Sequence, residues 1–138
     1  MKIHLKRNEK LFLNGAVIRL DRRGSIELLN DAQFLLEAHV MQQEDAKQPL
    51  QQIYFIVQSM LMDPTNVPYV MELFRAFSVR VKLNSKSAKY TEFIEAIEKQ
   101  VEAQDFFGAL KVLRRSFELD EDAPGSVSLS KVSSSEAA

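Results

Sequence analysis

The spacing of apolar residues changes once along this chain, from every second residue to every third or fourth. Apolar and polar residues alternate over roughly residues 2–41, which predicts β-strands with one buried face. From Pro49 to about residue 119 the apolar residues recur with helical spacing instead. Because one pattern follows the other without interleaving, the sequence predicts an α+β protein with its strands first and its helices second.

Turn signals divide the alternating part into five short strands. Asn14-Gly15 separates two apolar runs, and both residues tolerate the positive φ of a two-residue hairpin turn. Further breaks are expected at Arg7-Asn8-Glu9, at Asp21 to Gly24 and at Asn30-Asp31. We therefore expect a small five-stranded antiparallel meander, barrel-like in shape, packed on the helices or on a second copy. Since so small a sheet exposes its edges, the pattern also predicts a homo-oligomer formed through this β-region.

About four helices are expected after the strands. Pro49 suits a first helical turn, where its missing N–H costs nothing. Asp63-Pro64 ends that helix, because the residue before a proline avoids the α conformation. Asn66 and Asp105 are expected to be the N-caps of the second and fourth helices, and the stripe Tyr90 to Val101 marks the third.

The final residues lack an apolar period. Residues 120–138 are acidic and rich in serine, which predicts a disordered tail. The remainder is expected to be one domain over residues 1–119, with strands at 2–41 and helices at 49–119. No run approaches the ~20 apolar residues of a membrane helix, and MKIHLKRNEK has no apolar signal core. We therefore expect a cytoplasmic protein that does not associate with membranes.

The formal net charge of −1 conceals an uneven distribution of charge. Residues 1–23 carry seven basic and two acidic side chains, so the rest of the chain is acidic. This asymmetry predicts that the N-terminal part meets an anionic partner. Guanidinium and ammonium groups suit phosphate oxygens, and the candidate contacts are Arg22 and Arg23 at a hairpin tip, with Lys6, Arg7 and Lys10. Alternatively, these cations keep a turn soluble and protect an edge strand from aggregation.

The usual signatures of catalysis are missing from the sequence. There is no cysteine, which excludes disulfides and thiolate chemistry, and the two histidines are 35 positions apart. The four glycines do not form a phosphate-binding loop. We therefore expect no catalytic residues, no metal site and no cofactor, and hence no enzyme.

Several motifs together carry a family resemblance. In chain order they are Leu5-Lys6, Glu9-Lys10, Asn14 to Val17, Asp21-Arg22-Arg23, Ile53-Tyr54-Phe55, Asp63-Pro64 and the segment Phe106 to Arg115. On these motifs the chain resembles the FlbT family of flagellar biosynthesis regulators over about residues 3–119. It departs from the family pattern at Leu35-Leu36-Glu37, which lacks an arginine, and at Gln51-Gln52, where Ala-Arg is common.

The resemblance implies a post-transcriptional regulator that binds the 5′ untranslated region of flagellin mRNA. In some members of the family this represses translation and promotes mRNA decay, and in others the effect is activating. The resemblance also implies a functional pairing with FlaF, a second small flagellar regulator. One alternative stays open at this point: a protein adaptor that does not bind RNA and acts through a flagellar partner docked on its helices.

Overall fold

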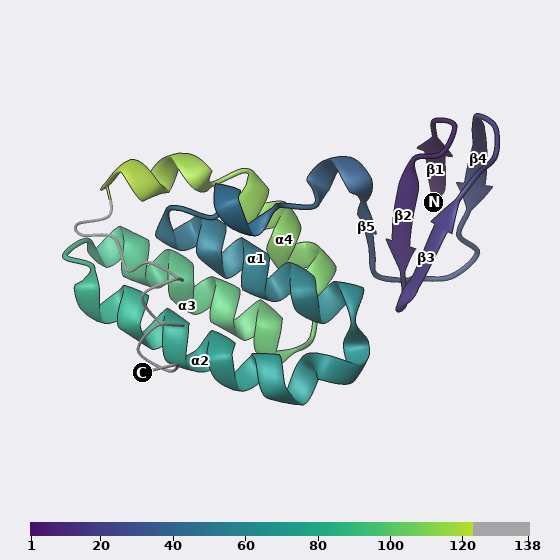
Figure 1. Cartoon of the computed structure of the whole chain (residues 1–138). Helices are drawn as coiled ribbons and strands as arrows, with labels where there is room; N and C mark the ends of the chain where they lie inside the picture. Colours follow the sequence, from purple (N-terminus) through teal and green to yellow (C-terminus); the bar gives the residue numbers. More distant parts are fainter. Residues whose placement is uncertain (123–138) are drawn as a thin grey trace.

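A computed structural model describes residues 1–122 and divides them into a β-lobe and a bundle of four helices (Figure 1). Five short strands lie in the β-lobe, and the helices follow in the chain, which confirms the predicted α+β class. The two parts meet through the last strand and the first and fourth helices. Residues 123–138, most of the tail predicted over 120–138, lie outside the described residues.

The strands form where the alternation predicts them, but they do not pair as a meander. Their bounds are β1 Lys2–Leu5, β2 Lys10–Leu13, β3 Ala16–Arg19, β4 Gly24–Glu27 and β5 Phe34–Leu36. All pairs are antiparallel, with β1 beside β4 in one sheet and the order β3-β2-β5 in the other. Of the connections between consecutive strands, only β2 to β3 is a hairpin. The two sheets stay separate and do not close into a barrel.

The two sheets share a small core of their own. Ile3, Leu5 and Leu11 are buried there, and half-buried apolar side chains from strands β2 to β5 and the links between them surround these three. Apolar partners on the neighbouring strands help to bury these side chains. Ile3 faces Ile26, and Leu11 lies between Ile18 and Leu36. The inward residues thus occupy alternate positions, as a half-buried strand requires.

The hairpin turn between β2 and β3 has the predicted chemistry. Asn14 and Gly15 have φ values of 51° and 83°, the left-handed region that this turn needs. A Cβ atom added to Gly15 would lie 3.4 Å from the Pro64 ring, so this turn approaches the corner between the first two helices. The turn therefore lies close to the bundle at this corner.

The four helices are α1 Pro49–Met62, α2 Val67–Asn84, α3 Ala88–Glu102 and α4 Phe106–Arg114. Helix α1 begins at the predicted proline and ends at Met62, just before Asp63-Pro64. The Asp105 carboxylate accepts a hydrogen bond from the Gly108 N–H at 3.0 Å, which confirms the predicted N-cap of α4. Asn66 occupies the N-cap position of α2, but its amide donates to Asp63 at 2.6 Å and does not cap the helix.

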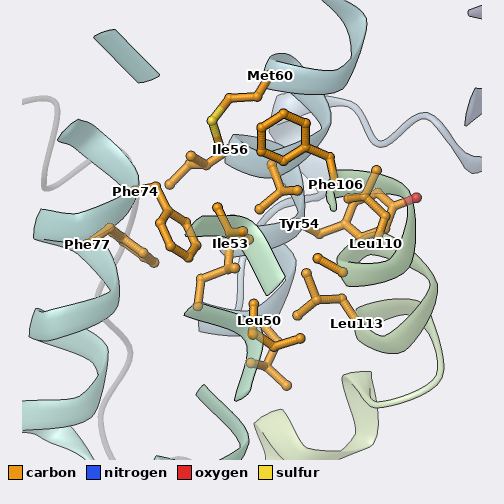
Figure 2. Close-up of a cluster of buried hydrophobic side chains, with 14 of the residues drawn as sticks. Leu50, Ile53, Tyr54, Ile56, Met60, Phe74, Phe77, Phe106, Leu110 and Leu113 are labelled. Atoms are coloured by element: carbon orange, nitrogen blue, oxygen red, sulfur yellow. The ribbon is translucent and has the colours of Figure 1, made fainter. Parts of the chain in front are cut away.

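Helix α1 lies at the centre of the bundle and is buried on most of its surface. Figure 2 shows side chains of α1 between the phenylalanines of α2 and the apolar residues of α4. The labelled members of this core are Leu50, Ile53, Tyr54, Ile56 and Met60 from α1, Phe74 and Phe77 from α2, and Phe106, Leu110 and Leu113 from α4. This burial explains why the α1 segment is apolar on several faces.

Gln51 and Gln52, the departures from the family pattern, both have structural roles. The Gln51 side chain accepts from the backbone N–H groups of Lys47 at 3.2 Å and Gln48 at 3.1 Å, which closes the first turn of α1. Gln52 is buried, and its amide donates to the Lys47 carbonyl at 3.4 Å. Among the described residues, both side chains form their hydrogen bonds with the backbone of Lys47 and Gln48 and none with the cations of the β-lobe.

Strand β5 connects the β-lobe to the bundle. Leu35 is buried in the helical core, while its neighbours Phe34 and Leu36 face the core of the β-lobe. Gln33, just before the strand, accepts from the backbone N–H groups of Phe106 at 2.8 Å and Phe107 at 3.1 Å. Its amide also donates to the Gln104 carbonyl at 2.7 Å. A single polar side chain thus ties β5 to the N-terminus of α4.

The boundary between domain and tail lies farther along the chain than residue 119. A 3-10 helix spans Phe117–Asp122, and Asp120 within it is buried. The Asp120 carboxylate accepts from the backbone N–H of Leu50 at 2.9 Å and from the Tyr90 hydroxyl at 3.2 Å. The polar residues around Asp120 predict that the tail begins at this position. In the structure, however, the Asp120 carboxylate accepts a hydrogen bond from a backbone N–H at the N-terminus of α1.

Candidate nucleic-acid interface

Two turns of the β-lobe lie together at one end. The first joins β1 to β2, and the second joins β3 to β4. The N–H of Asn8 in the first turn donates to the carbonyl of Leu20 in the second at 2.9 Å. The strand register leads to the same arrangement, since Leu5 faces Gly24 and Lys10 faces Arg19. Figure 1 shows both turns at the same end of the β-lobe, away from the hairpin at Asn14-Gly15.

This arrangement brings all five predicted contact residues to one end of the lobe, which we call the basic end. Arg19, which is not among the predicted contacts, joins them because the register places it directly beside Lys10. The position of Arg19 could have been predicted from the sequence, because the hairpin turn at Asn14-Gly15 fixes which residues of β2 and β3 face each other. All six cations are exposed, and the members of the basic end are Lys6, Arg7, Lys10, Arg19, Arg22 and Arg23.

The arginine pair does not lie at the tip of a hairpin, and that prediction is wrong. Strands β3 and β4 belong to different sheets, so Arg22 and Arg23 lie on the link that crosses between the sheets. The misassignment arose because a short polar break ending in glycine is compatible with a hairpin or with a crossing. The crossing still exposes both arginines, and it brings them next to the turn that carries Lys6 and Arg7.

Local hydrogen bonds hold these turns in place. Asn8 has a φ of 64°, a left-handed conformation that asparagine tolerates better than most residues. The Glu9 carboxylate accepts from the backbone N–H of Lys6 at 2.9 Å, which closes the β1–β2 turn. The acidic side chain in this turn therefore bonds to the backbone. Within residues 1–122 it forms no ion pair with the cations of the basic end.

The positive charges of the basic end are largely not neutralised by nearby acidic side chains. Its one ion pair among the residues that the structure describes joins Arg22 to Asp21 at 3.9 Å, with side chains 87% and 91% exposed. A pair that exposed and that long contributes little. Six cations and only two acids, Glu9 and Asp21, lie on these strand ends and turns. Such a surface attracts anions and is not committed to internal salt bridges.

The histidines and the buried tyrosine have structural partners. His4 Nδ1 lies 2.7 Å from the Ser25 hydroxyl on the outer face of the β1–β4 sheet. The Tyr54 hydroxyl donates to the His39 carbonyl at 2.6 Å and accepts from Arg114 at 2.9 Å. Burial and the nearby Arg114 lower the pKa of His39. Over the described range, 1–122, no three His, Cys, Asp or Glu side chains are grouped as a metal site would require.

Within residues 1–122, none of the four helices combines the length and the apolar character that a transmembrane span requires.

Comparison with known proteins gives a consistent result. The family model described as "Flagellar protein FlbT" matches residues 1–123. A protein of Mesorhizobium japonicum named "Probable flagellum biosynthesis repressor protein FlbT" is 42% identical over 125 residues, 91% of this chain and 85% of its own length. A second, from Bradyrhizobium diazoefficiens, named "Probable flagellum biosynthesis repressor protein FlbT 2", is 40% identical over 88% of this chain and 89% of its own. No solved structure matches significantly.

Proposed function

This chain belongs to the FlbT family, and from that premise we propose that it regulates flagellin synthesis by binding RNA. Its target is the 5′ untranslated region of flagellin mRNA, and binding controls translation and mRNA stability. The regulatory part of the proposal is supported by the relatives, which are named probable flagellum biosynthesis repressors. The RNA part is supported by the basic end.

The observation that carries the RNA contact is the convergence of cations from separate parts of the sequence. Residues 6–10 and 19–23 lie apart in the chain, yet the Asn8–Leu20 hydrogen bond and the strand register bring them together. Cations that only kept one turn soluble would not need to meet a second basic turn. A cluster on a braced backbone favours binding of an extended polyanion, since little further ordering is required on association.

The side chains at the basic end suit single-stranded RNA. Four of the six are arginines, whose planar guanidinium groups donate paired hydrogen bonds to phosphates and stack on unpaired bases. Two lysines add point charges that follow the backbone. An mRNA leader offers exposed phosphates and unpaired bases together, so both modes of contact are available.

The experiment is a binding titration of the purified full chain with its own flagellin leader at several salt concentrations. Each phosphate contact on a single strand contributes about −0.7 to the slope of log K against log salt. Three to six contacts predict a slope between about −2 and −4. A leader-length RNA of scrambled sequence is the control that separates sequence preference from charge attraction.

Two results would count against the proposal. Absence of binding at low salt would favour the adaptor function, in which a FlaF-like flagellar regulator is the partner and the helices carry the contact. Binding with a slope near zero would mean that phosphates are not held by the basic end. In the adaptor case, substitutions on the helices would abolish regulation, while substitutions at the basic end would not.

A further inference from the structure

Helix α2 exposes apolar side chains on the side that faces away from the core. Tyr69 is 76% exposed and Leu83 is 79% exposed, which is unusual for large apolar residues at the ends of one helix face. Val79, 46% exposed, lies between them. The core-facing residues Phe74 and Phe77 occupy the opposite side of the helix. Figure 1 shows α2 on the outside of the bundle.

Four residues on this side are arranged symmetrically about Ala76. Tyr69 and Leu83 each stand seven positions from Ala76, and Glu72 and Arg80 each stand four positions from it. Seven residues are about two helical turns and four are about one, so all of these positions share one face. We call it the α2 face, and its members are Tyr69, Glu72, Ala76, Val79, Arg80 and Leu83.

We propose that the α2 face binds a second copy of this chain, with the two α2 helices antiparallel and Ala76 on the two-fold axis. A two-fold axis at Ala76 brings each residue opposite the one that stands equally far on its other side. Glu72 of one copy then meets Arg80 of the other, and this ion pair occurs twice. Tyr69 packs on Leu83 in the same way. The small Ala76 side chain lets the helices approach closely where they cross.

The charges of α2 support this assignment. Arg75 makes a bidentate pair with Glu102 of α3 at 2.6 and 2.9 Å, and Lys82 pairs with Glu98 at 2.8 Å. Glu72 and Arg80 form no ion pair with any other residue that the structure describes. The cations that flank the face are thus paired with α3, and Glu72 adds only a weaker attraction to Arg75, so the two opposite charges on the face keep room for an ion pair with a second copy.

The strand edges are less suited to this contact. Sheet β1–β4 carries Lys2 and Glu27 at one end, and the exposed strand β3, although it carries the exposed Val17, ends in Arg19. Charged side chains on an edge strand disfavour the addition of another strand. The α2 face, by contrast, combines apolar ends with charges that are complementary to its own copy. Association through the β-region, expected from the sequence, therefore becomes the competing arrangement that the experiment must separate.

Charge reversal tests the antiparallel register directly. Sedimentation of the full chain over a range of concentrations should show a dimer. Glu72→Arg and Arg80→Glu should each weaken it at least about tenfold, because each puts like charges against each other at two places. Glu92→Arg, an exposed substitution of the same kind on α3, is the matched control and should leave the dimer unchanged. Circular dichroism verifies that each variant is folded.

Mixing the two charge-reversed variants is the decisive experiment. An E72R chain and an R80E chain repel their own copies, but each is complementary to the other in the proposed register. The mixture should form a tighter dimer than either variant forms alone, and the double variant E72R/R80E should associate like the unchanged chain. A chain that is monomeric throughout would overturn the proposal. It would also be overturned by a dimer that both single variants leave intact, or by a mixture that fails to associate.

Discussion

At the residue scale, the arginine pair gives the most direct test of the RNA contact. Both side chains lie on an exposed link between sheets, so replacing both by alanine should change the free energy of unfolding by no more than about 0.5 kcal/mol. The same change should weaken leader binding and make the salt slope shallower by about one to two units, because each phosphate that is no longer held removes roughly 0.7. Titration of R22A/R23A at several salt concentrations measures both effects.

A control for this variant must remove the same charge elsewhere. Lys86→Ala with Lys89→Ala removes two exposed cations, one just before α3 and one in its first turn, far in sequence from the basic end. This control should keep both the affinity and the slope. If R22A/R23A behaved like K86A/K89A, the arginines would be solvated link residues without a part in binding.

Asp120 gives a second prediction, on the pH dependence of stability. Burial raises the pKa of Asp120 above its ordinary value of 3.8, although hydrogen bonds from the Leu50 N–H and the Tyr90 hydroxyl oppose this. A raised pKa in the folded state means that the folded protein binds this proton more tightly than the unfolded chain. The resulting stabilisation is full below pH 3.8 and is lost as the pH rises through the folded pKa.

The isosteric Asp120→Asn variant does not titrate at this position and isolates the effect. The free energy of unfolding of the unchanged chain, relative to D120N, should therefore fall as the pH rises from 3.8. Burial also raises the pKa of Tyr90, so its hydroxyl stays a donor throughout this range. Urea unfolding of both chains from about pH 3.5 to about pH 7 provides the comparison. A difference that is constant with pH, or that rises, would contradict the raised pKa.

Residues that bond to backbone groups close by in the sequence could be predicted, and residues that bond to distant groups could not. Asn14-Gly15 and Asp105 act on backbone groups within three positions, and their residue types are sufficient to identify them. Asp120 bonds to a residue 70 positions away. Nothing near Asp120 in the sequence distinguishes it from the acids around it, because its role depends on a distant helix N-terminus.

At the element scale, the 3-10 helix after α4 leads to a third prediction. A chain that ends at Leu119 loses Asp120, which accepts a hydrogen bond from the first turn of α1, where Leu50 is buried. The Leu50 N–H then lacks its acceptor, which should cost about 1–3 kcal/mol for a group left unsatisfied. A chain that ends at Asp122 should retain the stability of the full chain. Urea unfolding of the two truncated forms separates them, and equal stabilities would contradict a capping role for Asp120.

For the strands, the sequence pattern predicts the segments but not how they pair. Alternation identifies the five segments and their inward residues, because burial of one face requires it. It contains no information on which strand pairs with which. A turn from β3 into β4 and a crossing from one sheet to the other have the same local sequence, and the choice between them depends on contacts of β1 and β2. The helices were predicted more completely, since their hydrogen bonds are internal.

At the scale of the whole molecule, the two proposed contact surfaces lie on different parts of the fold. The basic end lies on the β-lobe, and the α2 face lies on the outside of the bundle (Figure 1). The proposed RNA contact and the proposed contact between copies therefore use different surfaces and do not compete. A dimer built on α2 carries two basic ends, each on a lobe that β5 and Gln33 hold against its own bundle.

Two basic ends on one dimer predict that long and short RNAs respond differently to loss of the dimer. A leader that reaches both ends gains affinity from the second basic end, because its binding becomes intramolecular, by about 10²-fold at the lower end of typical values. A short oligonucleotide can occupy only one end and gains nothing. Glu72→Arg should therefore weaken binding of the full leader strongly and leave binding of a short oligonucleotide unchanged. Adding an equal amount of the R80E chain should restore leader binding, because the mixed dimer again has two basic ends.

Equal weakening for both RNAs would mean that Glu72 influences the basic end itself. Unchanged binding of both would mean that one basic end accounts for all of the binding.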